Sequence, residues 1–115
     1  VEKVFKTLVT RGADGDYFVF VVPVAGELNL KAAARAVGEK SVEMIHVSEI
    51  NGVTGYIRGG CSPIGMKKNY RTVIDDSCES QPTIMVSGGK IGTQVELSPR
   101  ALLDFIGAST APIAE

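Results

Sequence analysis

A chain of 115 residues is long enough to bury one hydrophobic core and too short for two, so the length predicts one domain spanning residues 1–115. Its hydrophobic fraction of 44% and charged fraction of 22% are ordinary for globular proteins and exclude a disordered chain. The net charge of −1 excludes a surface that is basic throughout, so any contact with nucleic acid has to come from a local patch.

The sequence also constrains the compartment and the cofactors. No apolar run is long enough to cross a bilayer, and the start of the chain has no charged-then-apolar signal pattern. Cys61 and Cys78 make neither a metal-binding spacing nor a disulfide framework, and a single histidine adds no standard ligand set. We therefore expect a cytoplasmic protein with no metal, no other cofactor and no membrane partner.

The first residues have the composition of a β-hairpin. β-Branched and aromatic residues predict strands at Val4–Val9 and Tyr17–Val24, and the cluster Gly12–Asp16 predicts the turn between them. The second strand is almost continuously apolar, which indicates burial on both faces, and Pro23 is expected near its end.

A helix, a short strand and a helical turn come next. Helical spacing of apolar residues predicts a helix over Leu28–Val37, with Asn29 as its N-cap and Gly38 just past its end. The elements expected after it are a strand at Val42–Ile45 and one helical turn at Ser48–Asn51, ended by Gly52.

The second half of the chain predicts three strands and a helix. The expected strands are Arg71–Ile74, ended by Asp75 and Asp76, and the pair Thr83–Val86 and Thr93–Leu97, joined by a glycine-rich hairpin. Ser98 as N-cap and Pro99 at the first helical position predict a helix that Gly107 ends. Its expected apolar stripe is Ala101, Leu102, Phe105 and Ile106. Because strands outnumber helices and occur in hairpins and crossovers, we expect an α+β fold with a mixed, curled, barrel-like sheet and helices packed outside.

The stretch Gly59–Gly65 is the least regular part of the chain. Its three glycines, one serine and one proline predict a rigid turn with exposed backbone N–H groups, a shape that can hold an oxygen or an anion. Composition alone favours a plain loop. The flanking residues favour a site, because no acidic residue lies between Ile50 and Ile74. The cations and tyrosines around the turn are Tyr56, Arg58, Lys67, Lys68, Tyr70 and Arg71.

Three side chains could carry chemistry. Strand alternation puts Lys6 between Val4 and Leu8 on one face. A lysine in this position either protects an edge strand from aggregation or is a functional cation in a pocket. The pattern does not decide between these two roles. Cys61 has glycines before it and cations near it, so it is either a reactive thiol or, as the pattern favours, a small residue filling the turn. His46 is the only histidine, and its position favours a surface or half-buried residue over a catalytic triad member.

An ordered set of short motifs resembles the YbaK/EbsC family, the branch of bacterial prolyl-tRNA editing proteins related to the insertion domain of prolyl-tRNA synthetase. The motifs are VFKTL (4–8), VPV (22–24), KSVEM (40–44), TGY (54–56), GGCSPIG (59–65), TVID (72–75) and VSGG (86–89). Together they span nearly the whole chain, and their order and spacing carry the resemblance.

The resemblance implies a free-standing deacylase that hydrolyses mischarged aminoacyl-tRNA, typically cysteine on the proline tRNA, with prolyl-tRNA synthetase as a candidate partner. The catalytic residues that it implies are Lys6, Gly59, Gly60 and Ser62, and the substrate-binding residues are Cys61, Pro63, Ile64, Gly65, Tyr56, Gln94 and Gly88. The candidate tRNA-binding residues are Arg58, Lys67, Lys68 and Arg71. The aminoacyl ester is already activated and a cysteinyl group carries its own thiol, so positioning and oxyanion stabilisation are the main tasks left to the protein.

The chain departs from the family pattern in four places, one of which is the basic run, where Met66, Asn69 and Tyr70 replace commoner residues. Family members carry roughly one helix-hairpin before the lysine strand, so we expect an N-terminally short editing domain. Gln94 stands where the family usually has an acid, and Cys61 stands where it usually has an aliphatic residue. Two alternatives therefore stay open: deacylation of alanine on the same tRNA, and a non-catalytic module that binds tRNA or a synthetase.

Overall fold

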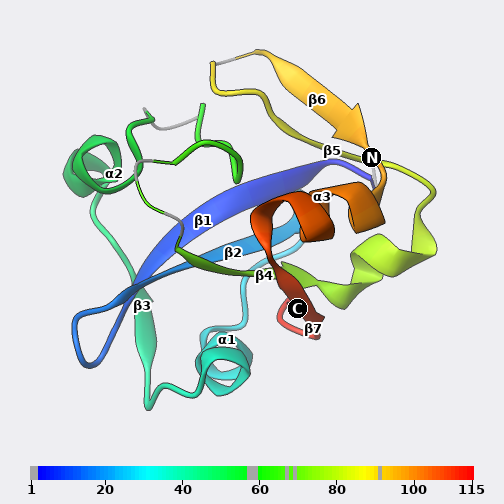
Figure 1. Cartoon of the computed structure of the whole chain (residues 1–115). Helices are drawn as coiled ribbons and strands as arrows, with labels where there is room; N and C mark the ends of the chain where they lie inside the picture. The colour runs from blue at the N-terminus through cyan, green and yellow to red at the C-terminus, as the bar shows by residue number, and fades with distance from the viewer. Residues whose placement is uncertain (1–2, 57–59, 67, 69, 91) are drawn as a thin grey trace.

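The strands of the chain form one large and one small sheet. The computed structural model describes residues 3–56, 60–66, 68, 70–90 and 92–115 (Figure 1). The strands are Phe5–Gly12 (β1), Tyr17–Pro23 (β2), Val42–Met44 (β3), Arg71–Asp75 (β4), Ile84–Ser87 (β5), Gln94–Leu97 (β6) and Ser109–Ala111 (β7). The large sheet has the order β3-β1-β2-β4-β7, and β5 pairs with β6. A bridge between Val4 and Met85 attaches the small sheet to β1.

Among the described residues, three α-helices and a 3-10 turn complete the fold. They are Leu30–Val37 (α1), Val47–Thr54 (α2), Pro99–Ile106 (α3) and the turn Asp76–Ser80 (η1). The strand pairs are antiparallel for β1–β2, β1–β3 and β5–β6 and parallel for β2–β4 and β4–β7. This arrangement confirms the predicted α+β class and its mixed sheet. No described helix has both the length and the apolar character needed to span a bilayer.

The central strand β2 is buried on both faces, as its apolar run predicts. Phe18, Phe20 and Val22 point to one face and form a cluster with α1. Val21 points to the other face and packs with Leu102 of α3, while the neighbouring Val19 packs near α2. Because side chains alternate along a strand, this one sequence builds the cores on both sides of the sheet.

Helix ends follow the expected capping rules. The Asn29 side chain accepts the Ala32 N–H at 3.0 Å, so α1 begins after Asn29 and not at Leu28. The Ser98 hydroxyl oxygen accepts the Ala101 N–H at 3.1 Å at the start of α3. These side chains satisfy N–H groups that have no partner inside the helix, which is why the helices start there.

The prediction that Gly52 ends the second helical segment is wrong. The helix α2 runs through Gly52 to Thr54, and Gly55 ends it with φ +86°. A glycine inside a helix costs about 1 kcal/mol. The burial of Val53 in the core offsets that cost, because it requires one more helical turn.

Two further expectations need correction. Phe105, placed in the apolar stripe of α3, is 74% exposed, and Ala101 is exposed too. The helix packs instead through Leu102, with Leu103 and Ile106 partly buried against the same cluster. Strand β7 and the turn η1 have no counterpart among the predicted elements. The short segment of β7 is a strand only because it pairs with β4.

The C-terminal segment is fastened to the sheet by one carboxylate. Asp75, at the end of β4, is only 5% exposed. Its Oδ1 accepts the N–H groups of Ile113 (3.0 Å) and Ala114 (2.8 Å), and its Oδ2 accepts the Ser77 N–H at 3.2 Å. Buried charges are stable only when they are hydrogen-bonded in this way, so Asp75 joins β4, η1 and the C-terminus into one unit.

Candidate active site

Within the described part of the chain, the outer edge of β1 is paired at its two ends and open between them. The Met85 N–H donates to the Lys3 carbonyl at 2.6 Å, and the Ile45 N–H donates to the Val9 carbonyl at 3.3 Å. Main-chain groups of alternate residues point to the same edge of a strand, so those of Phe5 and Thr7 face this edge too. The edge between β5 and β3 therefore presents backbone donors and acceptors to whatever lies beside it.

A cavity of about 690 Å³ lies along this open edge. Its walls come from β1, from the segment that runs from β3 into α2, from the glycine-rich loop and from the β5–β6 hairpin (Figure 1). The lining residues are Val4, Phe5, Lys6, Thr7, Leu8, Val9, Val24, Met44, Ile45, Val47, Ile50, Cys61, Ser87, Gly92, Thr93 and Gln94. Such a volume and such a largely apolar lining are typical of small-molecule sites.

Lys6 supplies a cation to this cavity. Within the described part of the chain, its ammonium group has no hydrogen-bond or ion-pair partner. Lys6 thus lies in the lining of the cavity, and its functional role there stays a prediction. A half-buried, uncommitted ammonium can attract an ester oxygen or a phosphate, because the low dielectric strengthens the interaction.

Thr7 is a polar cavity residue that the sequence pattern does not single out. Its hydroxyl oxygen is buried and has no hydrogen-bond partner in the described structure. Buried hydroxyl groups are normally paired, so this one is a polar group that the described residues leave unsatisfied beside the cavity. The signal that could have identified it is the same as for Lys6: a polar residue between two apolar neighbours, Phe5 and Val9, on one strand face.

Exposed apolar side chains form the rim of the cavity. Val24, Met44 and Val47 line the cavity and also expose much of their apolar surface to solvent. They come from three separate elements, so only the tertiary structure brings them together. An apolar rim favours a small side chain that carries no charge.

Cys61 is the loop residue that faces the cavity. It is half-buried, and burial raises the pKa of its thiol more than the hydrogen bond with Thr54 lowers it. The thiolate is the nucleophilic form of cysteine. Near neutral pH this side chain is therefore a neutral thiol that shapes the pocket, in agreement with the turn-filling role that its sequence context favours.

The other described residues of the loop do not line the cavity as the resemblance implies. Gly60 and Ser62 are buried, and the Ser62 hydroxyl oxygen accepts the Ile64 N–H at 3.2 Å inside the loop. Pro63 and Gly65 line a separate hollow beside α3. Direct contact between these loop residues and the substrate stays a prediction. In the structure, the hydrogen bond between Ser62 and Ile64 stabilises the shape of the loop.

Tyr56 connects this loop with the β5–β6 hairpin. Its hydroxyl group donates a hydrogen bond to the Ile64 carbonyl. A Cβ added to Gly65 would lie 3.0 Å from the Tyr56 hydroxyl oxygen, and one added to Gly89 would lie 3.1 Å from the ring. Gly88 closes the hairpin, since its N–H donates to the Thr93 carbonyl at 2.8 Å. Tyr56 and Gly88 thus support the cavity wall without lining it.

We expect Gly65→Ala to lower kcat/KM for aminoacyl-tRNA about tenfold or more, because a shift of the supporting loop moves the cavity wall. Gly65 has φ +74°, a conformation that costs roughly 1–2 kcal/mol for alanine, and its new methyl group would press on Tyr56. The matched control is Gly38→Ala, which also has φ +74° but has nothing within 4 Å. Equal activity losses in the two variants would contradict the role of Tyr56.

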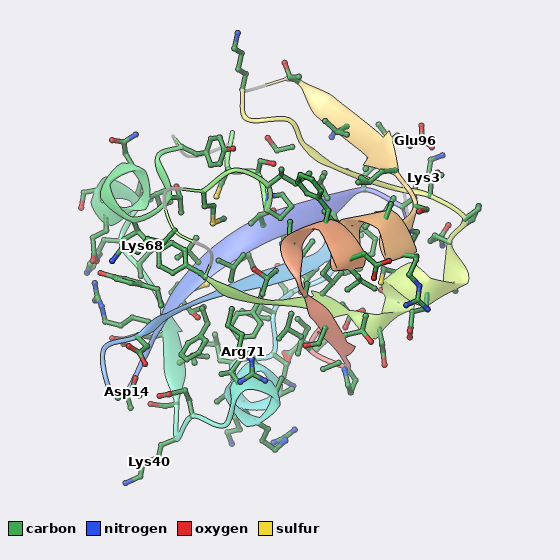
Figure 2. All side chains as sticks on the ribbon, in the orientation of Figure 1. Lys3, Asp14, Lys40, Lys68, Arg71 and Glu96 are labelled. Carbon is green, nitrogen blue, oxygen red and sulfur yellow. The ribbon has the colours of Figure 1, made fainter. Side chains whose placement is uncertain are left out.

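The two described candidates for tRNA binding, Lys68 and Arg71, lie beside different helices. Lys68 is exposed beside α2, whereas Arg71 lies by α1 (Figure 2). Arg71 donates to the carbonyls of Ala36 and Val37, both at 3.2 Å, and so caps the C-terminus of α1. Arg58, Lys67 and the catalytic candidate Gly59 lie outside the described residues. The tRNA contacts of all four cations stay predictions.

His46 and the described acidic residues are not part of the cavity lining. His46 is exposed at the N-cap of α2, and the described lining contains neither a histidine nor a carboxylate. The described residues also contain no cluster of three metal-ligating side chains. The described part of the cavity can therefore bind and polarise an ester, but it lacks a histidine-based nucleophilic device.

Comparisons with known proteins agree with this chemistry. A protein of Enterococcus faecalis (strain ATCC 700802 / V583), described as a candidate Cys-tRNA(Pro)/Cys-tRNA(Cys) deacylase, EbsC, is 47% identical over 96% of this chain and 68% of its own length. A proline–tRNA ligase of Brachyspira hyodysenteriae (strain ATCC 49526 / WA1) is 30% identical over 79% of this chain and 16% of its own length.

The fold has close structural relatives as well. A solved structure described as a candidate trans-editing enzyme for prolyl-tRNA synthetase superposes with a TM-score of 0.90 and 28% identity, covering 100% of this chain and 72% of its own. The profile of the aminoacyl-tRNA editing domain matches residues 1–105. The chain therefore belongs to the aminoacyl-tRNA editing domain family, whose YbaK/EbsC branch its sequence motifs resemble.

Proposed function

We propose that the chain hydrolyses the ester bond of mischarged aminoacyl-tRNA, with cysteine on the proline tRNA as the main substrate. The observation that carries this proposal is the ammonium group of Lys6, which has no partner among the described residues and belongs to an apolar cavity beside the outer edge of β1. The family and the E. faecalis relative support the same reaction.

The cavity is suited to a reaction in which the substrate supplies the nucleophile. The cysteinyl thiol attacks its own ester carbonyl, the ribose oxygen leaves with the thiol proton, and water then opens the cyclic thioester to free cysteine. Lys6 can stabilise the negative charge that develops on the carbonyl oxygen. The described cavity residues need to provide no activated nucleophile of their own, which agrees with the raised pKa of the Cys61 thiol.

We expect Cys61→Ala to keep most of the activity on cysteinyl-tRNA(Pro), because the thiol that reacts belongs to the substrate. Seryl-tRNA(Pro) should be a poor substrate for the same reason, since a hydroxyl group ionises far less than a thiol near neutral pH. Single-turnover deacylation of both substrates by the wild type and the variant measures this. A folded Cys61→Ala protein that binds tRNA but has lost activity, together with a trappable acyl-enzyme, would assign the reaction to Cys61 instead.

The amino acid, the partner and the compartment are finer parts of this proposal. An apolar rim also admits the methyl group of alanine, so alanyl-tRNA(Pro) belongs in the substrate panel. The similarity to a proline–tRNA ligase supports a synthetase that delivers the mischarged tRNA. A tRNA substrate implies action in the cytoplasm. A panel of charged tRNAs, assayed with and without prolyl-tRNA synthetase, tests the first two points: failure to deacylate any of them contradicts the enzymatic function.

A further inference from the structure

Another hollow, separate from the cavity and from the hollow beside α3, has a volume of about 430 Å³ and lies on the other side of α2 from the cavity. Its lining residues are Tyr17, Glu49, Gly52, Val53, Lys68 and Tyr70. Val47 and Ile50 of α2 face the cavity, whereas Glu49 and Val53 of the same helix face this hollow. Cys61 lines the cavity, and Lys68 and Tyr70, which follow it in the chain, line the hollow. The cavity and the hollow therefore share two walls: helix α2 and the segment that contains these three residues.

The aromatic rings of the hollow are held in place before any ligand arrives. The rings of Tyr17 and Tyr70 meet edge to face, with their centroids 5.9 Å apart. The Tyr70 hydroxyl donates to the Val53 carbonyl at 2.7 Å, and the Arg11 guanidinium lies 5.2 Å from the centre of the Tyr17 ring. Fixed, half-buried aromatic rings are the usual platform on which an unpaired base stacks.

The hollow has one negative group, the Glu49 carboxylate, and one positive group, the Lys68 ammonium. Glu49 pairs with Arg11, accepts the His46 N–H at 3.3 Å and remains 28% exposed. These contacts, first the hydrogen bond from Arg11, lower the pKa of its carboxyl group, so the group is an ionised acceptor near neutral pH. A carboxylate has about four acceptor positions, which leaves room for a donor from a ligand. Lys68 is exposed beside it and can meet a phosphate.

We propose that this hollow binds an unpaired cytidine of the CCA end of the aminoacyl-tRNA substrate, a proposal that rests on the function proposed above. Cytosine offers a face for stacking on Tyr70 and an exocyclic amino group that can donate to Glu49, while Lys68 meets the backbone phosphate. Uracil has a carbonyl oxygen in place of that amino group, which would face the Glu49 carboxylate unfavourably.

The relative positions of the two sites fit this assignment. The amino acid is esterified to the terminal adenosine, and two cytidines precede that adenosine in every tRNA. A helix with its side chains is about 10–12 Å across. With the aminoacyl group in the cavity, the terminal adenosine would cross α2 and bring a preceding cytidine to the hollow on its far side.

The test compares three cysteinylated substrates: adenosine alone, the trinucleotide CCA and the trinucleotide UUA. We expect the wild type to hydrolyse CCA with about tenfold higher kcat/KM than UUA, within the range that one good base contact provides. Glu49→Gln should bring this ratio close to one, because an amide group can both accept from cytosine and donate to uracil. Lys68→Ala should lower both trinucleotide rates alike, and Lys40→Ala, an exposed lysine far from Lys68 in Figure 2, should change neither.

Each outcome separates this inference from the proposed function. Hydrolysis of cysteinyl-adenosine by the wild type supports the catalytic cavity, and no hydrolysis of any of the three substrates would overturn both proposals. Equal rates on CCA and UUA would overturn the cytidine site alone. A ratio that stays tenfold in Glu49→Gln, with both rates lowered, would assign Glu49 a structural role and overturn its contact with the base. Effects that occur only when prolyl-tRNA synthetase is added would make the hollow a protein interface and would likewise overturn it.

Discussion

Replacement of Lys6 by alanine is expected to lower kcat/KM for cysteinyl-tRNA(Pro) by about a hundredfold or more, the usual effect of removing one charge-stabilising donor. Lys6 is the cation of the described cavity lining and has no partner there that could replace its charge. Since its ammonium group makes no hydrogen bond or ion pair within the described chain, its loss should leave the packing around β1 intact. Single-turnover deacylation and thermal unfolding of the same preparation measure the two effects.

Two further variants make this result specific. Lys40→Ala removes one positive charge from an exposed site far from the cavity and should keep wild-type turnover. Lys6→Arg keeps the charge but replaces a compact ammonium with a planar group, so it should recover only part of the activity. Full turnover by Lys6→Ala would contradict the proposed site. A large loss of melting temperature would show that Lys6 supports the fold instead.

Much of the fold could be predicted from the sequence because its signals are local. The Tyr17–Pro23 strand is a continuous apolar run, and Asn29 and Ser98 are strong helix caps, so these elements agree with the structure. The elements that were predicted with wrong bounds or not predicted at all depend on tertiary contacts. Gly52 is a poor helix residue that core packing keeps inside α2, and β7 is a strand only because β4 lies beside it. Local propensity has no access to either contact.

The candidate site could be predicted only in part for the same reason. Lys6 and Cys61 stand out because their residue types are unusual in their local surroundings, and both line the cavity. Met44 and Val47 are ordinary apolar residues, and only the open edge of β1 makes them a rim. Arg71 looks like part of a basic patch in sequence, but strand direction carries its side chain to the C-terminus of α1.

Asp75→Ala is expected to lower the free energy of unfolding by about 4–5 kcal/mol, since three hydrogen bonds to a charged group are lost and each contributes roughly 1.5 kcal/mol at the lower end of the usual range. For a chain of this size the melting temperature should fall by about 15 °C. The variant leaves the N–H groups of Ser77, Ile113 and Ala114 without their acceptor, which frees η1 and the C-terminus from β4. Urea denaturation near neutral pH measures the loss. Asp76→Ala, an exposed neighbour of the same charge, is the control and should change little.

The dependence of this effect on pH identifies its cause. Burial is the largest single influence on the Asp75 carboxyl group and opposes its ionisation, but the hydrogen bonds from Ser77, Ala114 and Ile113 together outweigh it and lower the pKa. The unfolded chain therefore binds a proton more readily than the folded chain does. The stabilisation is complete above the ordinary aspartate pKa of about 4 and is lost as the pH falls through the lower folded value. The wild type and Asp75→Ala should accordingly converge in stability under acid. A difference that stays constant down to acidic pH would show that the shape of the side chain, and not its charge, fastens the C-terminus.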